Sequence, residues 1–271
     1  MYIEIKVKYV IMERVITMLE KIIDIIRKAG EIYNSADRDK GVKEKGSAVN
    51  LVTKYDKMIQ DYIESELLKL IPSARFFDEE SEGENRLTDG WCFIIDPIDG
   101  TTNFIKGYQH SGISVALAKD KELVIGVVYD PDLDNMFYAE KGKGAYLNGE
   151  RIFASDCDMQ HSLVLFGTCP YEHELAHKTF TVTEEVFYRA LEVRRGGSAA
   201  LDICYVASGK SDLYYEFILR PWDWAGAVLI LNEAGGIATD CDGGALDLGA
   251  VKSFCCGNKN NLEEFYEIYK L

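Results

Sequence analysis

The sequence has no apolar run of the roughly 18 to 20 residues that a membrane-spanning helix needs. Its first residues, Met1-Tyr2-Ile3-Glu4, lack the form of a secretion signal, so we expect a cytoplasmic protein. The sequence also has few positively charged residues: it contains 30 Lys and Arg but 45 Asp and Glu, so its net charge is −15. A field of this sign disfavours nucleic acid and anionic membranes as partners.

Paired cysteine motifs are absent as well. The seven cysteines are an odd number and no two have C-x-x-C spacing, so we expect reduced thiols. No repeat, low-complexity tract or linker interrupts the 271 residues. We therefore expect residues 1–271 to form one unit, either a single large domain or two packed subdomains over about 12–150 and about 151–271.

The hydrophobic pattern predicts helices and strands that alternate in groups, which is typical of a layered α+β or mixed α/β fold. Helices are expected over 12–29, 54–70, 183–192, 199–208, 225–234 and 261–269. Strands are expected over 93–95, 112–118, 123–129, 136–139, 145–147, 162–166 and 212–217. The alternating segment 2–8 fits either an edge strand or a disordered extension.

The most informative segment runs from Asp96 to Phe104 and follows the apolar run Phe93-Ile94-Ile95, which reads as a buried strand. Asp96 and Asp99 are hard oxygen ligands placed on either side of a turn. Gly100 lets the backbone approach an anion, and the two threonines that follow it supply hydroxyls. The pattern predicts a turn that holds divalent cations beside a phosphate, whose oxygens are bound by free N–H groups.

Three other segments place acids or hydroxyls near the ends of expected elements. Phe76-Phe77-Asp78-Glu79-Glu80-Ser81 contains three consecutive acids, which taken alone indicates a solvated loop. Trp222-Asp223-Trp224-Ala225-Gly226 puts an aspartate at a helix start, where capping is the commonest role. Thr53 and Asp56 have the spacing of a capping box ahead of the 54–70 helix. Taken singly, each segment therefore has an ordinary structural explanation.

In this order and with these neighbours, the four segments resemble the inositol monophosphatase family of metal-dependent, lithium-sensitive phosphatases. The resemblance covers about residues 15 to 270 and rests on three specific motifs: Glu79-Glu80-Ser81, Asp96 to Phe104, and Trp222-Asp223-x-Ala225-Gly226. It implies an alternating α/β/α/β/α sandwich, commonly assembled as a homodimer. It also implies a hydrolase that uses Mg²⁺ to cleave a phosphate ester of a small polyol.

The same resemblance implies a set of metal ligands, for two or three Mg²⁺ ions in one site. The implied ligands are Glu79, Asp96, the Ile98 carbonyl, Asp99 and Asp223, with Glu80 as a supporting acid in the outer shell. So many carboxylates could not otherwise share a pocket with a phosphate, because repulsion at ~4 Å reaches several kcal/mol per pair at an effective dielectric near 20. Oxygen ligands that leave room for water favour Mg²⁺ over Zn²⁺.

A second implied set handles water and substrate. Thr101 and Asp56 would orient the attacking water, with Glu79 completing the catalytic group. The implied substrate contacts are Asp99, Gly100, Thr101, Thr102, Ser198, Ala199, Glu216 and Asp223. Because the family's counterpart of Glu216 accepts a hydrogen bond from an inositol hydroxyl, myo-inositol monophosphate is the expected substrate. Fructose 1,6-bisphosphate, histidinol phosphate and a nucleotide 3′-phosphate stay open.

Two positions depart from the usual family pattern, and two further motifs favour other chemistry. Asn50 replaces a frequent acid and Asp78 a frequent small residue, and Asp78 would add negative charge near the third metal.

His173-Glu174-Leu175-Ala176-His177 fits the H-E-x-x-H pattern of zinc peptidases, but no later histidine could complete such a site. Lys141-Gly142-Lys143-Gly144 lacks the ending of a P-loop, so we expect a hairpin turn. A catalytically silent fold that only binds phosphate is the remaining alternative.

Overall fold

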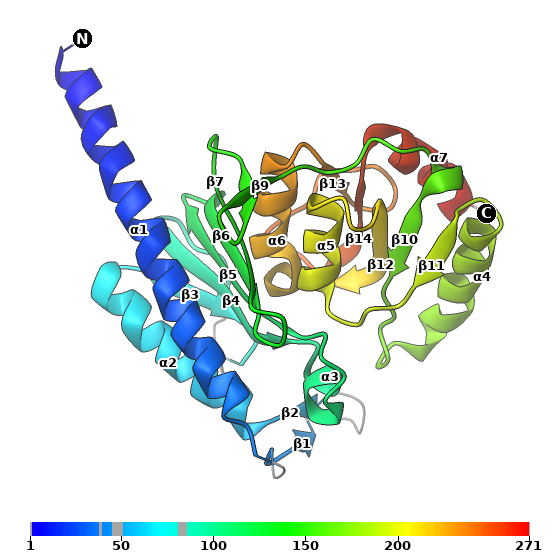
Figure 1. Cartoon of the computed structure of the whole chain (residues 1–271), viewed down its shortest axis with the longest axis horizontal. Helices are drawn as coiled ribbons and strands as arrows, with labels where there is room; N and C mark the ends of the chain where they lie inside the picture. The colour runs from blue at the N-terminus through cyan, green and yellow to red at the C-terminus, as the bar shows by residue number, and fades with distance from the viewer. Residues whose placement is uncertain (1, 38–39, 45–50, 81–85, 271) are drawn as a thin grey trace.

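The computed structural model describes residues 2–37, 40–44, 51–80 and 86–270, with side chains described from residue 18 onward. Two β-sheets and three helical layers alternate across the molecule (Figure 1). Residues up to Ile152 build a seven-stranded sheet, and later residues build a five-stranded one. Within the described ranges, none of the helices combines the length and the apolarity that a bilayer crossing requires.

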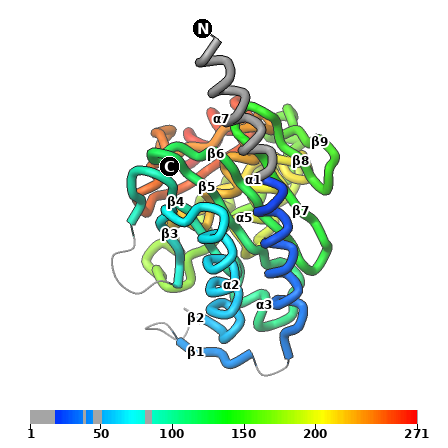
Figure 2. The backbone as a smooth tube through the Cα atoms, turned by 90° about the vertical axis from the view of Figure 1, so that its left-hand side faces the viewer, coloured from blue at the N-terminus to red at the C-terminus, as the bar shows by residue number. Residues whose placement is uncertain are grey.

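The helices cover or separate the two sheets in pairs. α1 (Tyr2–Asn34) and α2 (Lys54–Leu70) pack on the outer face of the seven-stranded sheet, where Figure 2 shows them side by side. α5 (Ala199–Ala207) and α6 (Pro221–Glu233) lie between the sheets. α4 (Ala176–Phe187) and α7 (Lys259–Tyr269) cover the outer face of the five-stranded sheet. The expected α/β/α/β/α sandwich is therefore confirmed.

The seven-stranded sheet has the order β3-β4-β5-β6-β7-β8-β9. Its strands are β3 (Arg75–Asp78), β4 (Trp91–Asp99), β5 (Gly112–Lys119), β6 (Glu122–Asp130), β7 (Asn135–Glu140), β8 (Ala145–Leu147) and β9 (Glu150–Ile152). β3 and β4 are parallel, and the other neighbours are antiparallel, as the predicted meander requires. Asn148 and Gly149 turn the chain after β8 with φ angles of 50° and 91°, which is the hairpin geometry that Asn-Gly favours. Lys141–Gly144 also lies in a hairpin connection, between β7 and β8, as predicted.

The five-stranded sheet has the order β11-β10-β12-β14-β13. Its strands are β10 (Leu163–Phe166), β11 (Glu192–Arg194), β12 (Leu213–Leu219), β13 (Ile237–Thr239) and β14 (Lys252–Gly257). Short elements complete the fold: β1 (Lys43–Glu44), β2 (Leu51–Val52), α3 (Thr101–Lys106), and the 3₁₀ turns η1 (Met159–His161) and η2 (His173–Leu175). Because β10 and β12 are parallel, their carboxyl ends meet at the same edge of the sheet.

Three apolar clusters fill the spaces between these layers. The first joins α1 and α2 to the seven-stranded sheet and contains the fully buried Ile63 and Phe93. The second surrounds α5 and α6 and contains Leu201 and Ile230, and the third lies under α4 and α7 around Phe265. Burial of apolar surface is the main favourable term in folding, so the middle cluster fixes α5 and α6 firmly against both sheets. The first turns of these two helices contribute to the pocket described below.

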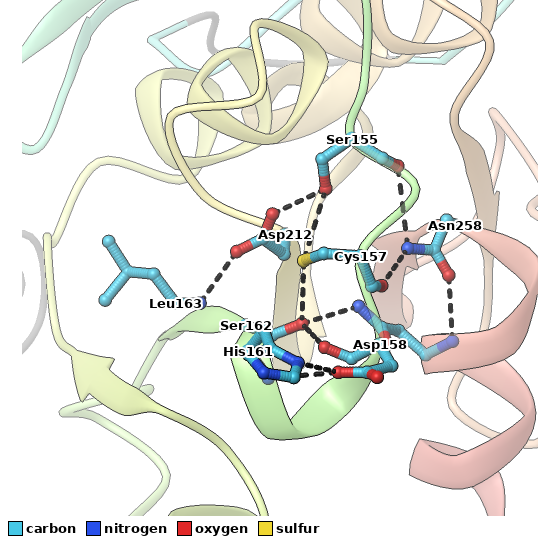
Figure 3. A network of polar contacts seen from close by, with 9 residues as sticks. Ser155, Cys157, Asp158, His161, Ser162, Leu163, Asp212 and Asn258 are labelled. Atoms are coloured by element: carbon cyan, nitrogen blue, oxygen red, sulfur yellow. Dashed lines mark hydrogen bonds and ion pairs between the residues drawn. The ribbon is translucent and has the colours of Figure 1, made fainter.

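A polar network fixes the chain where it crosses from one sheet to the other (Figure 3). Asp212, just before β12, accepts hydrogen bonds from Ser155 Oγ and from Leu163 N, the latter at 2.7 Å. Asn258, the N-cap of α7, donates its side-chain amide to Cys157 O at 2.8 Å. All seven cysteines are free thiols, as predicted, and Cys157 is a structural member of this network.

Two sequence predictions are wrong in the placement of helices. Residues 2–8 belong to α1 and form neither an edge strand nor a disordered extension. Apolar residues at positions 3, 7 and 10 also fit a helical spacing, and extending a helix is less costly than nucleating one. The helix expected over 183–192 is α4, which begins at Ala176 and ends at Phe187. Its three threonines lower the intrinsic helix propensity, so the helix depends on burying Val182 and Val186.

Candidate active site

A pocket of about 380 Å³ opens where elements from both halves of the chain converge. Its walls include the carboxyl end of β4, the strand β12, the segment after β10, and the first turns of α3, α5 and α6. Six acidic side chains line it: Glu79, Asp96, Asp99, Asp202, Glu216 and Asp223. All of these except Asp202 are candidates from the sequence, so the structure brings the predicted acids into one place.

A β-bulge lets β4 present two aspartates to the same side. Asp96 lies opposite Ser114 and Asp99 lies opposite Gly112, so three steps along β4 match two steps along β5. Residues two apart on a regular strand share a face, so the extra residue on β4 brings both carboxylates to one side. Ile98 N donates to Asp96 Oδ1 at 3.0 Å and fixes the first of them.

Gly100 joins β4 to α3 in a conformation that L side chains rarely adopt. Its φ is 87° and its ψ is 41°, in the left-handed region that favours glycine. A Cβ at this position would lie 2.9 Å from Gly197 O and 3.1 Å from His110 O, so a larger residue has no room. The turn therefore packs directly against the loop that precedes α5.

The capping box predicted at the start of α2 is present, and it also brings Asp56 to the site. Thr53 Oγ1 accepts from Tyr55 N at 3.1 Å, and Thr53 N donates to Asp56 Oδ2 at 2.8 Å. The other oxygen, Asp56 Oδ1, lies 3.4 Å from Thr101 Oγ1, which is itself 3.1 Å from Ile98 O. The structure thus places Thr101 in contact with the aspartate that the resemblance pairs with it.

β3 delivers the acidic segment to the edge of the pocket. Glu79 N donates to Ile95 O at 3.3 Å, which continues the parallel pairing of β3 with β4 past the end of the strand. Glu79 lines the pocket and Glu80 follows it half-buried. Asp78 is fully buried and accepts a hydrogen bond from Gln60 Nε2 of α2 at 2.7 Å. The Asp78 carboxylate therefore contacts α2 and does not line the pocket.

Asp99 and Asp223 are each held by the start of a helix. Asp99 Oδ2 accepts from Ser198 Oγ at 2.6 Å and from Ala200 N at 2.7 Å, in the first turn of α5. Asp223 Oδ2 accepts from Arg220 N at 2.7 Å. Arg220 is the N-cap of α6, so Asp223 lies in the first turn and is not the capping residue that its position in the sequence suggests.

Burial and mutual repulsion perturb three aspartates of this site. Burial first, and then the charges of Glu79, Asp99, Asp223 and Asp56, raise the pKa of Asp96 well above its ordinary value. Burial, with the charges of Asp99 and Glu79, likewise raises the pKa of Asp223. Burial raises the pKa of Asp99 to about 6, although its hydrogen bonds from α5 oppose the change. Acids perturbed in this way by burial and by each other are typical of functional sites.

The donor set of the pocket fits a hard divalent cation. Asp96, Asp99 and Asp223 each use one carboxylate oxygen for a backbone N–H, while the second oxygen has no hydrogen bond to the described residues. Among the side chains that the structure describes, no three His, Cys, Asp or Glu side chains are gathered closely enough to enclose an ion. Carboxylates of like charge separate unless a cation offsets their repulsion. Oxygen-only donors around an open space are the chemistry that Mg²⁺ prefers.

The five-stranded sheet supplies the opposite wall of the pocket. Tyr214 and Glu216 point to the same face of β12, and Tyr214 Oη donates to Glu216 Oε2 at 2.7 Å. A Cβ on Gly167, just after β10, would lie 1.8 Å from that oxygen, so the carboxylate occupies the space that glycine leaves. Burial raises the pKa of Glu216 to about 7. Ser198 caps α5, and Ala199 lines the same pocket.

Some features of the pocket escape the sequence analysis. Gly167 directly follows the strand predicted over 162–166, and a glycine at a strand end is a signal for close approach. Nothing in the sequence indicates the role of Tyr214 or the contact of Asp202 with His110, because both depend on tertiary packing. Asn50 lies outside the described residues.

The rival zinc-peptidase motif does not form the structure it would need. His173 belongs to the 3₁₀ turn η2, whereas His177 belongs to α4, so the two histidines do not share one helix face. Neither takes part in a cluster of metal-binding side chains within the described part of the chain. The peptidase alternative therefore has no structural support.

Comparison with known proteins agrees with this geometry. The profile of the "Inositol monophosphatase family" matches residues 14–270. "Inositol monophosphatase 2" of Rattus norvegicus is 37% identical over 247 residues, covering 89% of this chain and 85% of its own length. The crystal structure of the extragenic suppressor protein suhB from Bartonella henselae superposes with a TM-score of 0.85 and 32% identity, covering 94% of this chain and 98% of its own. A staphylococcal IMPase-II structure described as bound to inositol monophosphate has a TM-score of 0.77 and 28% identity, covering 91% and 90% of the two chains. The chain belongs to the inositol monophosphatase family.

Proposed function

We propose that this protein is a Mg²⁺-dependent phosphomonoesterase that hydrolyses myo-inositol monophosphate to inositol and inorganic phosphate. The observation that carries the proposal is the convergence of Glu79, Asp96, Asp99 and Asp223 in one pocket, beside the contact of Thr101 with Asp56. Relatives that are named inositol monophosphatases, and one that is described with inositol monophosphate bound, support the choice of substrate.

The acidic side chains would hold the cations. Glu79, Asp96 and the Ile98 carbonyl would form one Mg²⁺ site, and Asp96, Asp99 and Asp223 a second. Glu79 would also contact a third ion through water, and Glu80 would support the site from the outer shell. Bound Mg²⁺ would supply a nucleophilic water at neutral pH and offset the charge of the phosphate and the leaving oxygen. The second carboxylate oxygens of the three aspartates support this assignment, since none of them has a hydrogen bond to a residue that the structure describes.

The chain's own groups would orient the reactants. The Thr101 hydroxyl, which donates its single proton to Asp56 Oδ1 or to Ile98 O, would accept a hydrogen bond from the attacking water. Backbone N–H groups of Gly100, Thr101 and Thr102 at the start of α3 would bind the phosphate oxygens. No side-chain nucleophile is required, so the phosphate passes directly to water.

The wall formed by β12 and α5 would recognise the polyol. Glu216 would accept a hydrogen bond from an inositol hydroxyl, and the backbone at Ser198 and Ala199, at the start of α5, would line the ring. A carboxylate held by Tyr214 and confined by Gly167 has little freedom, which suits a group that discriminates between hydroxyl patterns.

A homodimer is the assembly we propose, through the face of α4 and β11. Phe180, Phe187, Tyr188 and Leu191 gather there, each between 52% and 71% exposed. Residues 176–194 carry three Lys or Arg and three Glu, so this face is neutral in a chain of net charge −15. A second copy can approach a neutral apolar face without the repulsion that it meets elsewhere. Light scattering tests this: Phe187→Asp should halve the mass, whereas Phe153→Asp, at an equally exposed phenylalanine, should not.

An activity panel tests the proposed reaction. Release of phosphate from inositol 1-phosphate, fructose 1,6-bisphosphate, histidinol phosphate and adenosine 3′,5′-bisphosphate is measured with Mg²⁺ and with EDTA. We expect the highest kcat/KM for inositol 1-phosphate, and no activity in EDTA. Asp96→Asn should abolish activity, whereas the exposed Asp242→Asn should not change it. Hydrolysis that persists in EDTA would show that the mechanism is wrong.

A further inference from the structure

The first turn of α5 is joined to the turn after β4 by hydrogen bonds that reach a proposed metal ligand. Asp99 Oδ2 accepts from Ser198 Oγ and from Ala200 N, at 2.6 and 2.7 Å. The position of this carboxylate therefore depends on where the first turn of α5 lies. A displacement of that turn would move Asp99 Oδ2, or would leave it without its donors.

A second polar contact holds the same turn at a point that the proposed mechanism does not use. Asp202 Oδ1 lies 2.9 Å from His110 Nε2, and Asp202 is only 1% exposed. Asp202 N donates to Ser198 O at 2.9 Å, so the pair and the Asp99 contact belong to one helical turn. The His110 ring also packs edge-on against Tyr205, with ring centroids 5.5 Å apart.

Asn103 ties the same segments together from the other side. Its Nδ2 donates to His110 O at 2.7 Å and to Gly196 O at 3.0 Å, so one amide bridges α3, the loop after it and the loop before α5. Gly196 lies directly on the histidine–aspartate pair: a Cβ there would be 2.1 Å from Asp202 Oδ1 and 2.6 Å from His110 Nε2. The loop, the turn and the helix start thus form one packed unit beneath the pocket.

Holding α5 through the buried His110–Asp202 pair lowers the stability of the fold. The second oxygen of Asp202 is buried and finds no hydrogen-bond partner among the described residues, which is unfavourable for a carboxylate. Apolar side chains of similar volume would pack α5 at least as stably, because desolvation of a buried ion pair offsets much of its attraction. A directional contact is useful where the position of a neighbouring group matters more than stability.

We propose that His110 and Asp202, together with Asn103, are positioning residues that fix the first turn of α5 and so hold the Asp99 carboxylate where it can bind a cation. The inference rests on the proposed function, because it takes Asp99 to be a metal ligand. None of the three residues needs to touch the cation, the water or the phosphate. Their effect on catalysis is transmitted through Ser198 and Ala200.

The test compares two substitutions at the pair. His110→Phe combined with Asp202→Asn keeps the ring against Tyr205, removes the buried charge and removes the directional contact. His110→Gln alone keeps an N–H donor close to the position of Nε2. Mg²⁺ is titrated in each protein with two readouts, the rise in unfolding temperature and the rate of inositol 1-phosphate hydrolysis.

We expect the double variant to fold but to need about 10- to 100-fold more Mg²⁺ for half of either effect, the range found when groups that orient metal ligands are removed. Its KM for inositol 1-phosphate at saturating Mg²⁺ should change much less. The His110→Gln protein should keep most of the Mg²⁺ affinity of the unmodified protein. Thr183→Val is the matched control, because it removes a buried 2.8 Å contact with Tyr215 on the outer face of the five-stranded sheet, opposite to the face of Tyr214 and Glu216, and should lower the unfolding temperature only.

The outcomes separate the two proposals. A double variant with the Mg²⁺ midpoint of the unmodified protein, or a Thr183→Val protein with the same shift as the double variant, overturns the positioning role while the proposed function stands. An unmodified protein that neither binds Mg²⁺ nor hydrolyses inositol 1-phosphate overturns the proposed function, and the positioning role falls with it.

Discussion

Replacing Asp99 with asparagine should make the cation-free protein more stable and should remove its response to Mg²⁺. Asp99 is 9% exposed, and burial raises its pKa from an ordinary value of 3.8 to about 6. At neutral pH the ionised side chain is therefore held in the fold against its preference for water. Asparagine has nearly the same shape and keeps one oxygen to accept from Ser198 Oγ and Ala200 N.

The size of the effect follows from the pKa. The difference between 3.8 and about 6, at about 1.4 kcal/mol per pH unit, corresponds to about 3 kcal/mol of lost stability when Asp99 is ionised. The sign follows from the raised folded-state pKa: the penalty is absent below about pH 4, grows between about pH 4 and pH 6, and is complete above that. Hydrogen bonds to a neutral amide are weaker than those to a carboxylate, so a net gain of about 1 to 3 kcal/mol is expected. In a chain of this size that gain raises the unfolding temperature by about 3 to 10 °C.

Differential scanning calorimetry in EDTA and in saturating Mg²⁺ checks this prediction. In EDTA at neutral pH, Asp99→Asn should unfold at a higher temperature than the unmodified protein, and the difference should vanish near pH 4. In Mg²⁺ the unmodified protein should gain stability, whereas the variant should gain little and should have no phosphatase activity. The exposed Asp242→Asn serves as the control and should change nothing under either condition. A lower unfolding temperature for Asp99→Asn in EDTA would falsify this account of the site.

Three further predictions concern other parts of the structure. Gly167→Ala puts a methyl group where the Glu216 carboxylate lies. The kcat/KM for inositol 1-phosphate should therefore fall about 10- to 100-fold, while hydrolysis of nitrophenyl phosphate stays near its original rate. Equal losses on both substrates would contradict the role of Glu216 in polyol recognition. Thr53→Val removes the cap of α2 and should cost about 1 kcal/mol in urea unfolding, together with some loss of kcat; unchanged stability would show that the cap is not needed. Substituting both His173 and His177 by alanine should leave the Mg²⁺-supported phosphatase activity unchanged, and a zinc-selective chelator should not lower that activity in either protein. A loss of activity with zinc release would revive the peptidase motif.

Local sequence signals predicted the parts of the fold whose structure is set locally. The bounds of α2 follow from the capping box at Thr53 and the stop before Pro72, and the structure has the helix over Lys54–Leu70. The hairpin of β5 and β6 and the turn at Asn148 follow from alternation and from turn residues in the same way. Where a segment's own hydrogen bonds and its neighbours within a few residues decide its conformation, the sequence suffices.

Elements that depend on packing were placed less well. α4 is shifted because its threonines obscure a helix that buried valines define, and residues 2–8 join α1 although their alternation resembles a strand. In the pocket, the acids could be identified because their motifs are specific. The contacts of Tyr214 with Glu216 and of His110 with Asp202 join residues in ways that no local spacing reveals. The residues that hold a site in position are therefore harder to identify from a sequence than the residues that form the site.

The pocket draws its walls from both sheets, and this has a consequence for how the protein gains activity after synthesis. Glu79 follows β3 and Asp96 lies on β4 of the seven-stranded sheet, whereas Glu216 lies on a strand of the other sheet and Asp223 on a helix packed between them. Neither half holds all of the proposed metal ligands, so we expect no hydrolysis before the halves dock. In refolding from denaturant, recovery of phosphatase activity should coincide with the slowest phase, after the secondary structure of each half has formed. Two fragments cut in the crossing after β9 should be inactive apart and should regain turnover only on reassembly.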